Sequence, residues 1–403
     1  MKTIAIICEY NPFHNGHAYQ LARLRDEHPD AVLLCIMSGC FTQRGEPAVL
    51  SPYARAEAAI GGGADLVLEL PQPWASASAE YFAAGGVAVA HGLGCVDGLA
   101  FGCESADPEA PMRVAEGLDS PLLQARLAAP PENPTEGPAA RIARLYRECI
   151  GDDGGMLSAP NNLLAVQYCR AIRQLNSSIK PLPMLRRGSG YHSPELEGEN
   201  PSATAVRCAL RQGSDVEALA ALGAHLPLTT CAVLAREIQA GRGPVFPENL
   251  SQAILSFYRL AAPEALEGCA SMSGGLHHRL IAAAHEARTA GEMFTLAAAK
   301  HYTDTRLYRA ALQGMLGVTP ADLAESPAWT LLLGASQRGL SLLRELRRRD
   351  SLPIITKPAD IPTVLSPRQA ELHRRAAALY TLAMPASAPS AEFIKYAPYI
   401  ARA

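Results

Sequence analysis

Short, continuous apolar runs alternate with amphipathic segments over the first hundred residues, and this alternation constrains the fold more than any other feature. Four runs have the length and continuity of buried strands: Thr3–Cys8, Ala31–Met37, Leu66–Leu70 and Val96–Phe101. Three segments between them have helical character: His17–Glu27, Pro52–Ile60 and Ser78–His91. Such alternation predicts a doubly wound parallel sheet of the α/β class, whose ligands bind at the carboxyl ends of the strands.

The rest of the chain has a different pattern. Residues 106–180 are mainly helical, and Lys180–Arg186 has the composition of one more strand. The helices expected around it are Ala139–Glu148, Asn162–Leu175 and Thr204–Arg211. We expect no further buried strand after about residue 215. The sequence therefore predicts an α/β domain over 1–215, followed by a mainly helical domain over 216–403.

Composition excludes some classes of protein. With 48% hydrophobic and 19% charged residues, the chain is not disordered. A net charge of −3 excludes a strongly basic protein, although it does not exclude a basic region. Residues 300–375 contain twelve Lys or Arg and seven Asp or Glu, a local charge of +5 that leaves −8 elsewhere. Solvated helix faces and a nucleic-acid-binding surface are both compatible with this segment.

The sequence favours a cytoplasmic protein. No run of about 18 uncharged apolar residues is present, so no transmembrane helix and no membrane partner are expected. The N-terminus resembles a weak signal peptide, but Glu9, Asn11, Pro12 and His14 interrupt it, so we interpret it as a first strand. The ten cysteines are scattered without a CxxC pair, which favours free buried thiols over a structural zinc site or disulfides.

The clearest chemical motif follows the first strand. Asn11-Pro12-Phe13-His14-Asn15-Gly16-His17 lies between that strand and the first helix, and so contains the start of the helix. Unpaired N–H groups and the positive end of the helix dipole suit a phosphate there. His14 and His17 are three residues apart, so both can face one ligand and stabilise charge on an α-phosphate. A pair of histidines that only cap the turn is the alternative.

A second motif stands about 190 residues later. Ser202-Ala203-Thr204-Ala205-Val206-Arg207 opens a predicted helix with hydroxyl groups and places an Arg one turn later. This pattern fits a second phosphate-binding site, although an ordinary N-cap has the same residues.

Several other residues have two readings. Gln43-Arg44-Gly45-Glu46, at the carboxyl end of the second strand, is a substrate or RNA contact or an exposed turn. Asp65 and Glu69 could simply pair with a nearby arginine such as Arg55. His192 is a site residue or a loop histidine, and His277-His278 fits a helix surface.

Together these motifs resemble the tRNA(Met) cytidine acetate ligase family of the HxGH nucleotidyltransferase superfamily. The signature is Glu9 to His17, and further similar segments follow in the family's order: Ser38 to Phe41, Gln43 to Pro47, Ala64 to Pro71, Ser78 to Ala83, Phe101 to Ser105, Pro160 to Leu164, Arg186 to His192, Ser202 to Arg207, Lys300 to Arg309, Leu333 to Gly339 and Pro353 to Thr356. The similarity spans most of the chain and is densest before residue 210.

The resemblance implies a Rossmann-like nucleotidyltransferase domain and a ligase that forms a carbon–nitrogen bond. The family activates acetate with ATP, releases pyrophosphate and acetylates N4 of the wobble cytidine of elongator tRNA(Met). Members of the superfamily usually use Mg²⁺ when they attack the α-phosphate, so Mg²⁺ is expected here. The resemblance implies catalytic roles for His14 and His17. The ATP-binding residues that it implies are Ile7, Cys8, Glu9, Tyr10, Asn11, Pro12, Phe13, His14, Asn15, Gly16, His17, Ala18, Tyr19, Gln20, Gly102, Asn162, Arg186, Ser202, Thr204 and Arg207.

Other assignments are less specific. Gln20 replaces a histidine common in the family, Arg187 beside Arg186 is an alternative nucleotide contact, and Glu104 is the one candidate carboxylate for Mg²⁺. The expected tRNA-binding residues are Lys300, Arg306, Arg309, Arg347, Arg348 and Arg349. A small-molecule adenylyltransferase of the same superfamily is the alternative function, and an RNA-binding protein without catalysis is the third.

Overall fold

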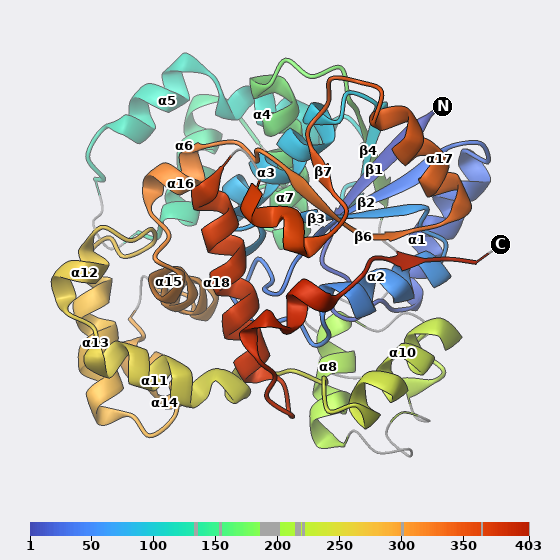
Figure 1. Ribbon diagram of the computed structural model, residues 1–403. Helices are drawn as coiled ribbons and strands as arrows, with labels where there is room; N and C mark the ends of the chain where they lie inside the picture. Colours follow the sequence, from blue (N-terminus) through green and yellow to red (C-terminus); the bar gives the residue numbers. More distant parts are fainter. Residues whose placement is uncertain are drawn as a thin grey trace.

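The computed structural model describes residues 1–132, 136–152, 155–185, 202–213, 219, 222–299, 302–363 and 366–402. Its centre is one twisted sheet with the strand order β5-β4-β1-β2-β3-β6-β7, and β8 pairs with β6 (Figure 1). The strands are β1 Thr3–Cys8, β2 Val32–Ser38, β3 Leu66–Leu70, β4 Gly98–Cys103, β5 Lys180–Leu185, β6 Thr330–Ala335, β7 Ile354–Ile355 and β8 Tyr399–Ile400. Strands β1 to β5 are parallel, so the doubly wound α/β prediction is confirmed.

Helices cover both faces of the sheet because the strand side chains alternate between two hydrophobic cores. Ile4 and Ile6 of β1 join one core, and Ala5 and Ile7 join the other. On the first face pack α1 Asn15–Glu27 and α2 Pro52–Gly61. On the second pack α3 Ala79–Gly92, α4 Ala110–Leu118, α7 Pro160–Gln174 and α17 Gln337–Leu346. Near the second face, α5 Pro121–Ala128 contacts α6 Pro138–Cys149.

The C-terminal half is mainly helical, as expected, and shares the first core with the sheet. Its longer helices are α10 Leu228–Gln239, α11 Ser251–Leu260, α13 Leu276–Glu286, α14 Ala290–Ala297, α15 Asp304–Leu316 and α18 Pro367–Ala383. The shorter ones are α12 Pro263–Glu267 and α16 Pro320–Ala324, with 3-10 turns η2 Pro247–Leu250, η3 Pro358–Thr363 and η4 Ser390–Lys395. One more 3-10 turn, η1 Trp74–Ser76, follows β3 in the N-terminal half. In Figure 1, α11 to α14 form a group on one side of the long α18. The predicted boundary itself, at residues 214–218, lies outside the described residues.

The expectation that no buried strand follows residue 215 is wrong. β6 is buried along its whole length and pairs antiparallel with β3, and the Thr330 hydroxyl donates to the Glu69 carbonyl at 2.7 Å. Its apolar run is only six residues, too short for periodicity to separate a strand from a buried helix. The C-terminal half therefore completes the sheet of the N-terminal half.

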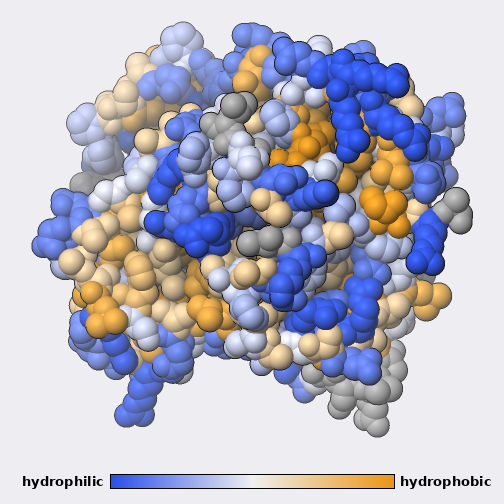
Figure 2. Space-filling model, viewed as in Figure 1, coloured by the Kyte–Doolittle hydropathy of each residue, from blue (hydrophilic) through white to orange (hydrophobic). Residues whose placement is uncertain are grey.

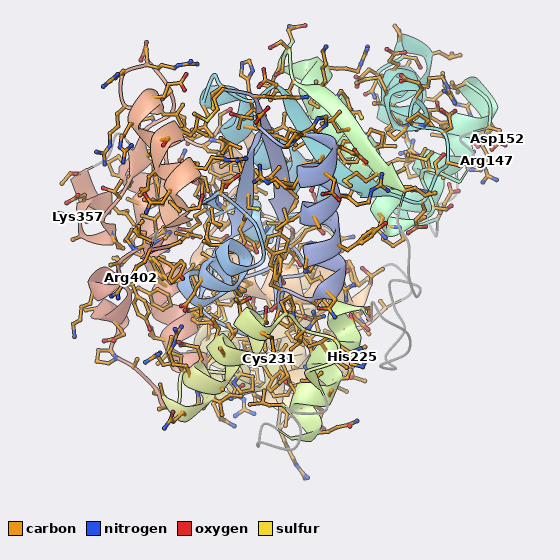
Figure 3. All side chains as sticks on the ribbon, turned by 90° about the vertical axis from the view of Figure 1, so that its right-hand side faces the viewer. Arg147, Asp152, His225, Cys231, Lys357 and Arg402 are labelled. Atoms are coloured by element: carbon orange, nitrogen blue, oxygen red, sulfur yellow. The ribbon has the colours of Figure 1, made fainter. Side chains whose placement is uncertain are left out.

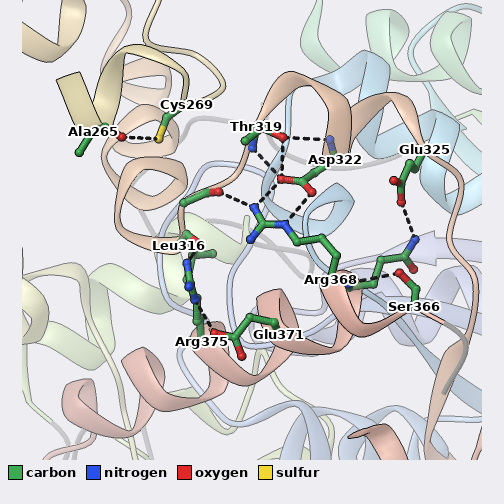
Figure 4. Close-up of polar contacts among 12 residues, drawn as sticks. Ala265, Cys269, Leu316, Thr319, Asp322, Glu325, Ser366, Arg368, Glu371 and Arg375 are labelled. Carbon is green, nitrogen blue, oxygen red and sulfur yellow. Dashed lines mark hydrogen bonds and ion pairs between the residues drawn. The ribbon is translucent and has the colours of Figure 1, made fainter. Parts of the chain in front are cut away.

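Ion pairs inside the helical half neutralise part of its basic surplus. Arg368 of α18 donates to both carboxylate oxygens of Asp322 and to the Gly317 carbonyl, joining α18, α16 and the end of α15 (Figure 4). Arg374 and Arg375 both pair with Glu371 and hold the pKa of that carboxyl at about 2. These arginines thus have structural partners among the described residues.

The surface and the thiols agree with a globular chain. The face in Figure 2 is largely hydrophilic, with separate hydrophobic patches. No described helix combines the length and the hydrophobicity needed to cross a bilayer. All ten cysteines are free; Cys35, Cys40, Cys103 and Cys169 are buried and the others half-buried. His277, expected on a helix surface, is instead buried in α13.

We predict that Gly339→Ala lowers the free energy of unfolding by about 2 kcal/mol, because overpacking against a rigid neighbour is costly. A Cβ at Gly339 would lie 1.9 Å from the carbonyl oxygen of Asp65, where α17 meets the start of β3. The matched control is Gly291→Ala in α14, whose Cβ would meet nothing closer than 3.9 Å and should stabilise by about 0.5 kcal/mol. Denaturant unfolding followed by circular dichroism measures both; equal stabilities of the two variants would contradict this packing.

Candidate functional site

The HxGH turn lies at the carboxyl end of β1, in the middle of the sheet. His14 is the N-cap of α1: its Nδ1 accepts from the Gly16 N–H at 3.1 Å, while the Nδ1 of His17 accepts from the His14 N–H at 3.3 Å. A ring whose Nδ1 accepts a hydrogen bond carries its proton on Nε2 when neutral. The two rings stack with centroids 3.7 Å apart. The histidines therefore cap the helix and also hold two Nε2–H donors next to each other.

Aromatic side chains pack against one another within the HxGH turn and the residues before it. The rings of Tyr10 and Phe13 meet edge to face at 4.9 Å, and Tyr10 lies 4.7 Å from the His17 ring. Tyr10 is 1% and Phe13 0% exposed, and Asn11 and Pro12 are also buried. Within the predicted ATP-binding segment these four residues shape the turn, whereas Asn15 to Gln20 reach the surface at least in part.

The two motifs meet, although 196 positions separate the residues in contact. Arg207 of α8 (Ala203–Gln212) donates from Nη1 to the Asn11 carbonyl at 2.8 Å and from Nη2 to the Thr204 hydroxyl at 3.3 Å. Ser202 caps α8 by accepting from the Ala205 N–H at 3.1 Å. A guanidinium and a second helix start thus lie beside the HxGH turn, an arrangement that suits the phosphates of one ligand.

The carboxyl end of β4 lies on the same side of the sheet as the HxGH turn. The Asn162 side chain of α7 accepts from the Glu104 N–H at 2.8 Å and from the Cys103 thiol at 3.4 Å, so it holds the chain just after Gly102. Four residues of interest lie outside the described residues: Arg186, Arg187, His192 and Lys300.

Arg55 of α2 is the residue whose role sequence reasoning missed. Its side chain is fully buried and donates to four main-chain carbonyls: Leu50 at 3.1 Å, Ser38 at 2.9 Å, and Gly39 and Glu9 as well. The suggested pairing of Arg55 with Asp65 or Glu69 is wrong. Asp65 pairs with Arg25, and Glu69 lies 3.5 Å from His373. Only the three-dimensional course of the chain brings these carbonyls together, so no local signal could have shown it.

Glu9 follows β1 directly and precedes the HxGH turn. Its Oε1 accepts from the Gln43 N–H at 2.7 Å. Burial raises the pKa of Glu9, against the opposing charges of Arg207, Arg44 and Arg55. Three positive charges therefore act on the carboxylate that precedes the HxGH turn and offset part of its negative charge.

The helical half also reaches the turn directly. The Asn15 N–H donates to the carbonyl of His225 at 3.1 Å, and the Asn15 side chain donates to the carbonyl of Ala224 at 3.0 Å. His225 lies just before α10 (Figure 3). Nothing in the sequence signals this contact, because the residues are about 210 positions apart.

The predicted tRNA-binding residues fall into two groups. Arg306 and Arg309 lie on α15, and Gly45 of the loop after β2 packs against the Arg309 backbone. This group is therefore near the carboxyl ends of the strands, where the HxGH turn lies. The Arg306 guanidinium lies 4.7 Å from the Tyr302 ring centroid, and burial lowers the pKa of Arg309 to about 10.

The second group, Arg347, Arg348 and Arg349, is exposed at the end of α17. Arg349 pairs with Glu345 and donates to the Gly94 carbonyl, in the connection that leads into β4. That connection lies at the amino end of the sheet, where the Asp97 N–H bonds Thr3. The structure therefore places this group at the amino ends of the strands, on the opposite side from the HxGH turn.

A protein-built metal site does not accompany these residues. Within the described ranges, no three His, Cys, Asp or Glu side chains cluster as they would around a metal ion. Glu104, the candidate carboxylate for Mg²⁺, is exposed and accepts from the Asn161 amide at 2.7 Å.

Comparison with known proteins gives one consistent result. The family model described as HIGH Nucleotidyl Transferase matches residues 1–392. The tRNA(Met) cytidine acetate ligase of Acetivibrio thermocellus is 34% identical over 394 residues, 95% of this chain and 95% of that protein. That of Caldanaerobacter subterraneus subsp. tengcongensis is 34% identical over 95% of this chain and 96% of its own. The crystal structure of Thermotoga maritima TmcAL bound with alpha-thio ATP has 30% identity, full coverage of both chains and a TM-score of 0.89; its apo form scores 0.92.

We predict that Arg55→Met lowers the free energy of unfolding by about 3 kcal/mol, because it leaves several buried carbonyls without a donor. The control is Arg23→Met, which removes an exposed ion pair with Glu27 on α1 and should leave the free energy of unfolding close to that of the wild type. Denaturant titration of both variants tests this, and a loss below about 1 kcal/mol for Arg55→Met would contradict the assigned role.

Proposed function

The chain belongs to the HIGH nucleotidyltransferase family and, within it, to the tRNA(Met) cytidine acetate ligases, and from this membership we propose that it acetylates N4 of the wobble cytidine of elongator tRNA(Met) with acetate and ATP. The observation that carries the proposal is the contact of Arg207 with the HxGH turn, because it joins both phosphate motifs into one site. The relative bound with alpha-thio ATP supports a nucleotide there.

In the first step, an acetate oxygen attacks the α-phosphorus of ATP. The bond from that phosphorus to the bridging oxygen breaks, and pyrophosphate leaves with the electron pair. Acetate needs no base at neutral pH, so the protein supplies position and charge stabilisation. The Nε2–H groups of His14 and His17 donate to the phosphate oxygens, while Arg207 and the start of α8 with Ser202 hold the departing pyrophosphate.

In the second step, cytosine N4 attacks the acetyl carbon of acetyl-adenylate. The carbon–oxygen bond to the phosphate breaks, AMP leaves, and the proton from N4 passes to solvent. The base must leave its stack to reach the cleft, as other enzymes that modify bases require. In this proposal Mg²⁺ binds the ATP phosphates, which are its usual ligands, and no residue of the chain is assigned to it.

The two halves divide the work. Residues 1–215 activate acetate, and residues 216–403 hold tRNA, with Arg306 and Arg309 near the reacting base and Arg347 to Arg349 against a more distant part of the RNA. Strand β6 of the second half pairs with β3 of the first, and the His225 carbonyl accepts from the Asn15 N–H. We therefore expect the two halves to act as one unit. Since ATP and tRNA are the substrates, we place the enzyme in the cytoplasm. A small-molecule adenylyltransferase would have no use for the helical half, which makes that alternative weaker.

We predict that the protein catalyses acetate-dependent exchange of pyrophosphate into ATP, and that His14→Ala and His17→Ala together reduce the rate at least about 100-fold, because both remove donors to the developing charge. The exchange of radioactive pyrophosphate measures this. Exchange that survives the double substitution would contradict catalysis at the HxGH turn. Exchange that needs a nucleotide or phosphopantetheine in place of acetate would favour the adenylyltransferase.

We also predict that replacing Arg347, Arg348 and Arg349 by Glu weakens tRNA binding at least about 10-fold while acetate-dependent exchange is unchanged. Binding is measured by filter retention over a range of salt concentrations. Loss of three phosphate contacts should make the plot of log affinity against log salt shallower by about 2 to 3 units of slope. An unchanged slope would remove the end of α17 from the RNA interface, and equal loss of exchange would indicate misfolding.

A further inference from the structure

Asn15 stands between the two histidines of the HxGH turn, yet it bonds to the helical half. Its N–H donates to the His225 carbonyl at 3.1 Å, and its side-chain amide donates to the Ala224 carbonyl at 3.0 Å. The N–H of the next residue, Gly16, is bonded to Nδ1 of His14 at 3.1 Å. Asn15 thus holds two consecutive peptide groups of the helical half against the start of α1.

The segment that accepts these two bonds has a fixed shape. The His225 and Leu226 N–H groups both donate to the Leu222 carbonyl, at 2.9 and 3.1 Å. Leu222 and Leu226 are buried in the core that the sheet shares with the helical half. α10 begins two residues later and packs against α2. The Ala224 and His225 carbonyls therefore keep one position relative to α10.

The segment after α10 is bonded to the HxGH turn and to α8. The Val245 N–H donates to the Val49 carbonyl at 2.8 Å, and the Val49 N–H donates to the Asn11 side chain at 2.7 Å. Arg211, in the last turn of α8, pairs with Glu248 at 3.2 Å. The segments on both sides of α10 are thus connected to the elements that carry the two phosphate motifs.

The chain continues from there to the helices that carry proposed tRNA contacts. η2 leads directly into α11, and α11 packs against α14 and α15. Arg306 and Arg309 lie on α15. α10 and its flanking segments therefore connect the proposed RNA-binding helices to the phosphate site, and the bonds of Asn15 join this connection directly to the HxGH turn.

Acetyl transfer depends on the distance between these two regions. Cytosine N4 must come within about 3 to 3.5 Å of the acetyl carbon, and a displacement of about 1 Å can lower such a rate about 100-fold. Water competes for the same carbon: its oxygen bonds to the acetyl carbon, the carbon–oxygen bond to the phosphate breaks, and acetate, AMP and a proton are released. An enzyme that loses this alignment therefore consumes ATP without modifying tRNA.

We propose that Asn15 is a positioning residue for acetyl transfer, because its bonds to Ala224 and His225 keep acetyl-adenylate aligned with the cytosine that the helical half presents. This inference rests on the proposed function and adds the element that couples its two steps. The side chain acts through the backbone of the helical half and needs no contact with the reacting atoms.

The ratio of AMP released to N4-acetylcytidine formed tests this role, because it compares the two fates of acetyl-adenylate at any rate of its formation. We expect equal amounts of both products from the wild type. Asn15→Asp keeps the size of the side chain but places a carboxylate oxygen against the Ala224 carbonyl. It should raise the ratio at least about fivefold, while KM for tRNA stays within about twofold. Asn15→Ala, which removes the donor without adding charge, should change the ratio in the same direction.

The matched control is Thr330→Val, which removes another hydrogen bond between the two halves. The Thr330 hydroxyl donates to the Glu69 carbonyl at 2.7 Å, on strands that β2 separates from β1. The ratio for Thr330→Val should equal that of the wild type even when the variant unfolds more easily. AMP is measured by chromatography and the modified nucleoside by mass spectrometry.

An unchanged ratio in Asn15→Asp and Asn15→Ala would overturn the proposal. An equal rise in Thr330→Val would also overturn it, because any loosening between the halves would then suffice. If neither Asn15 variant forms AMP, Asn15 belongs to the first step and the proposal is wrong. If Asn15→Asp does not fold, Asn15→Ala decides by the same ratio. A wild type that releases AMP but acetylates no tRNA would instead reject the proposed function.

Discussion

The buried guanidinium of Arg55 is the interaction on which the site depends. It joins the carbonyls of Glu9, Ser38, Gly39 and Leu50, and so ties the end of β1 to the end of β2 and to the start of α2. A fully buried charge is tolerable only when fixed dipoles surround it, and here the dipoles are the strand ends themselves. Parallel strands bring their carboxyl ends to one edge, but this clamp sets how far apart the loops that follow them stand.

The rest of the site builds on that edge. The HxGH turn follows β1 just beyond Glu9. The Asn11 side chain accepts a hydrogen bond from the Val49 N–H, and the Asn11 carbonyl accepts one from Arg207. Asn15 is held by the carbonyls that precede α10, and the loop after β2 is held by Glu9 and α15. Segments from both halves therefore converge on one short turn. This convergence would let the proposed nucleotide-activating sheet and the proposed RNA-binding helical half share one reaction centre.

Much of the fold was predictable because its strands are buried on both faces. Thr3–Cys8 and Leu66–Leu70 have the bounds expected from their apolar runs, and Pro52 marks the start of α2. β6 was missed because a six-residue apolar run among helices is ambiguous, and because it joins the sheet far from its neighbours in sequence. The resemblance to the family implies that both phosphate motifs bind ATP, and in the structure Arg207 of the second motif contacts the carbonyl of Asn11 in the first.

The contacts that could not be predicted are those that depend on where distant backbone atoms lie. Arg55 looks like an ordinary partner for a carboxylate until the fold places four carbonyls around it. His225 contributes a backbone oxygen, for which residue type gives no signal. The Arg347 to Arg349 run was recognised by charge alone, and charge does not say which edge of a sheet it will occupy.

The most direct test of the central claim is mass spectrometry of the wobble nucleoside of elongator tRNA(Met) after incubation with the purified protein, ATP and isotopically labelled acetate. We predict N4-acetylcytidine carrying the label, formed only when ATP is present and without any acetyl-CoA. An unmodified wobble cytidine, in the presence of Mg²⁺ and with a protein shown to be folded, would contradict it.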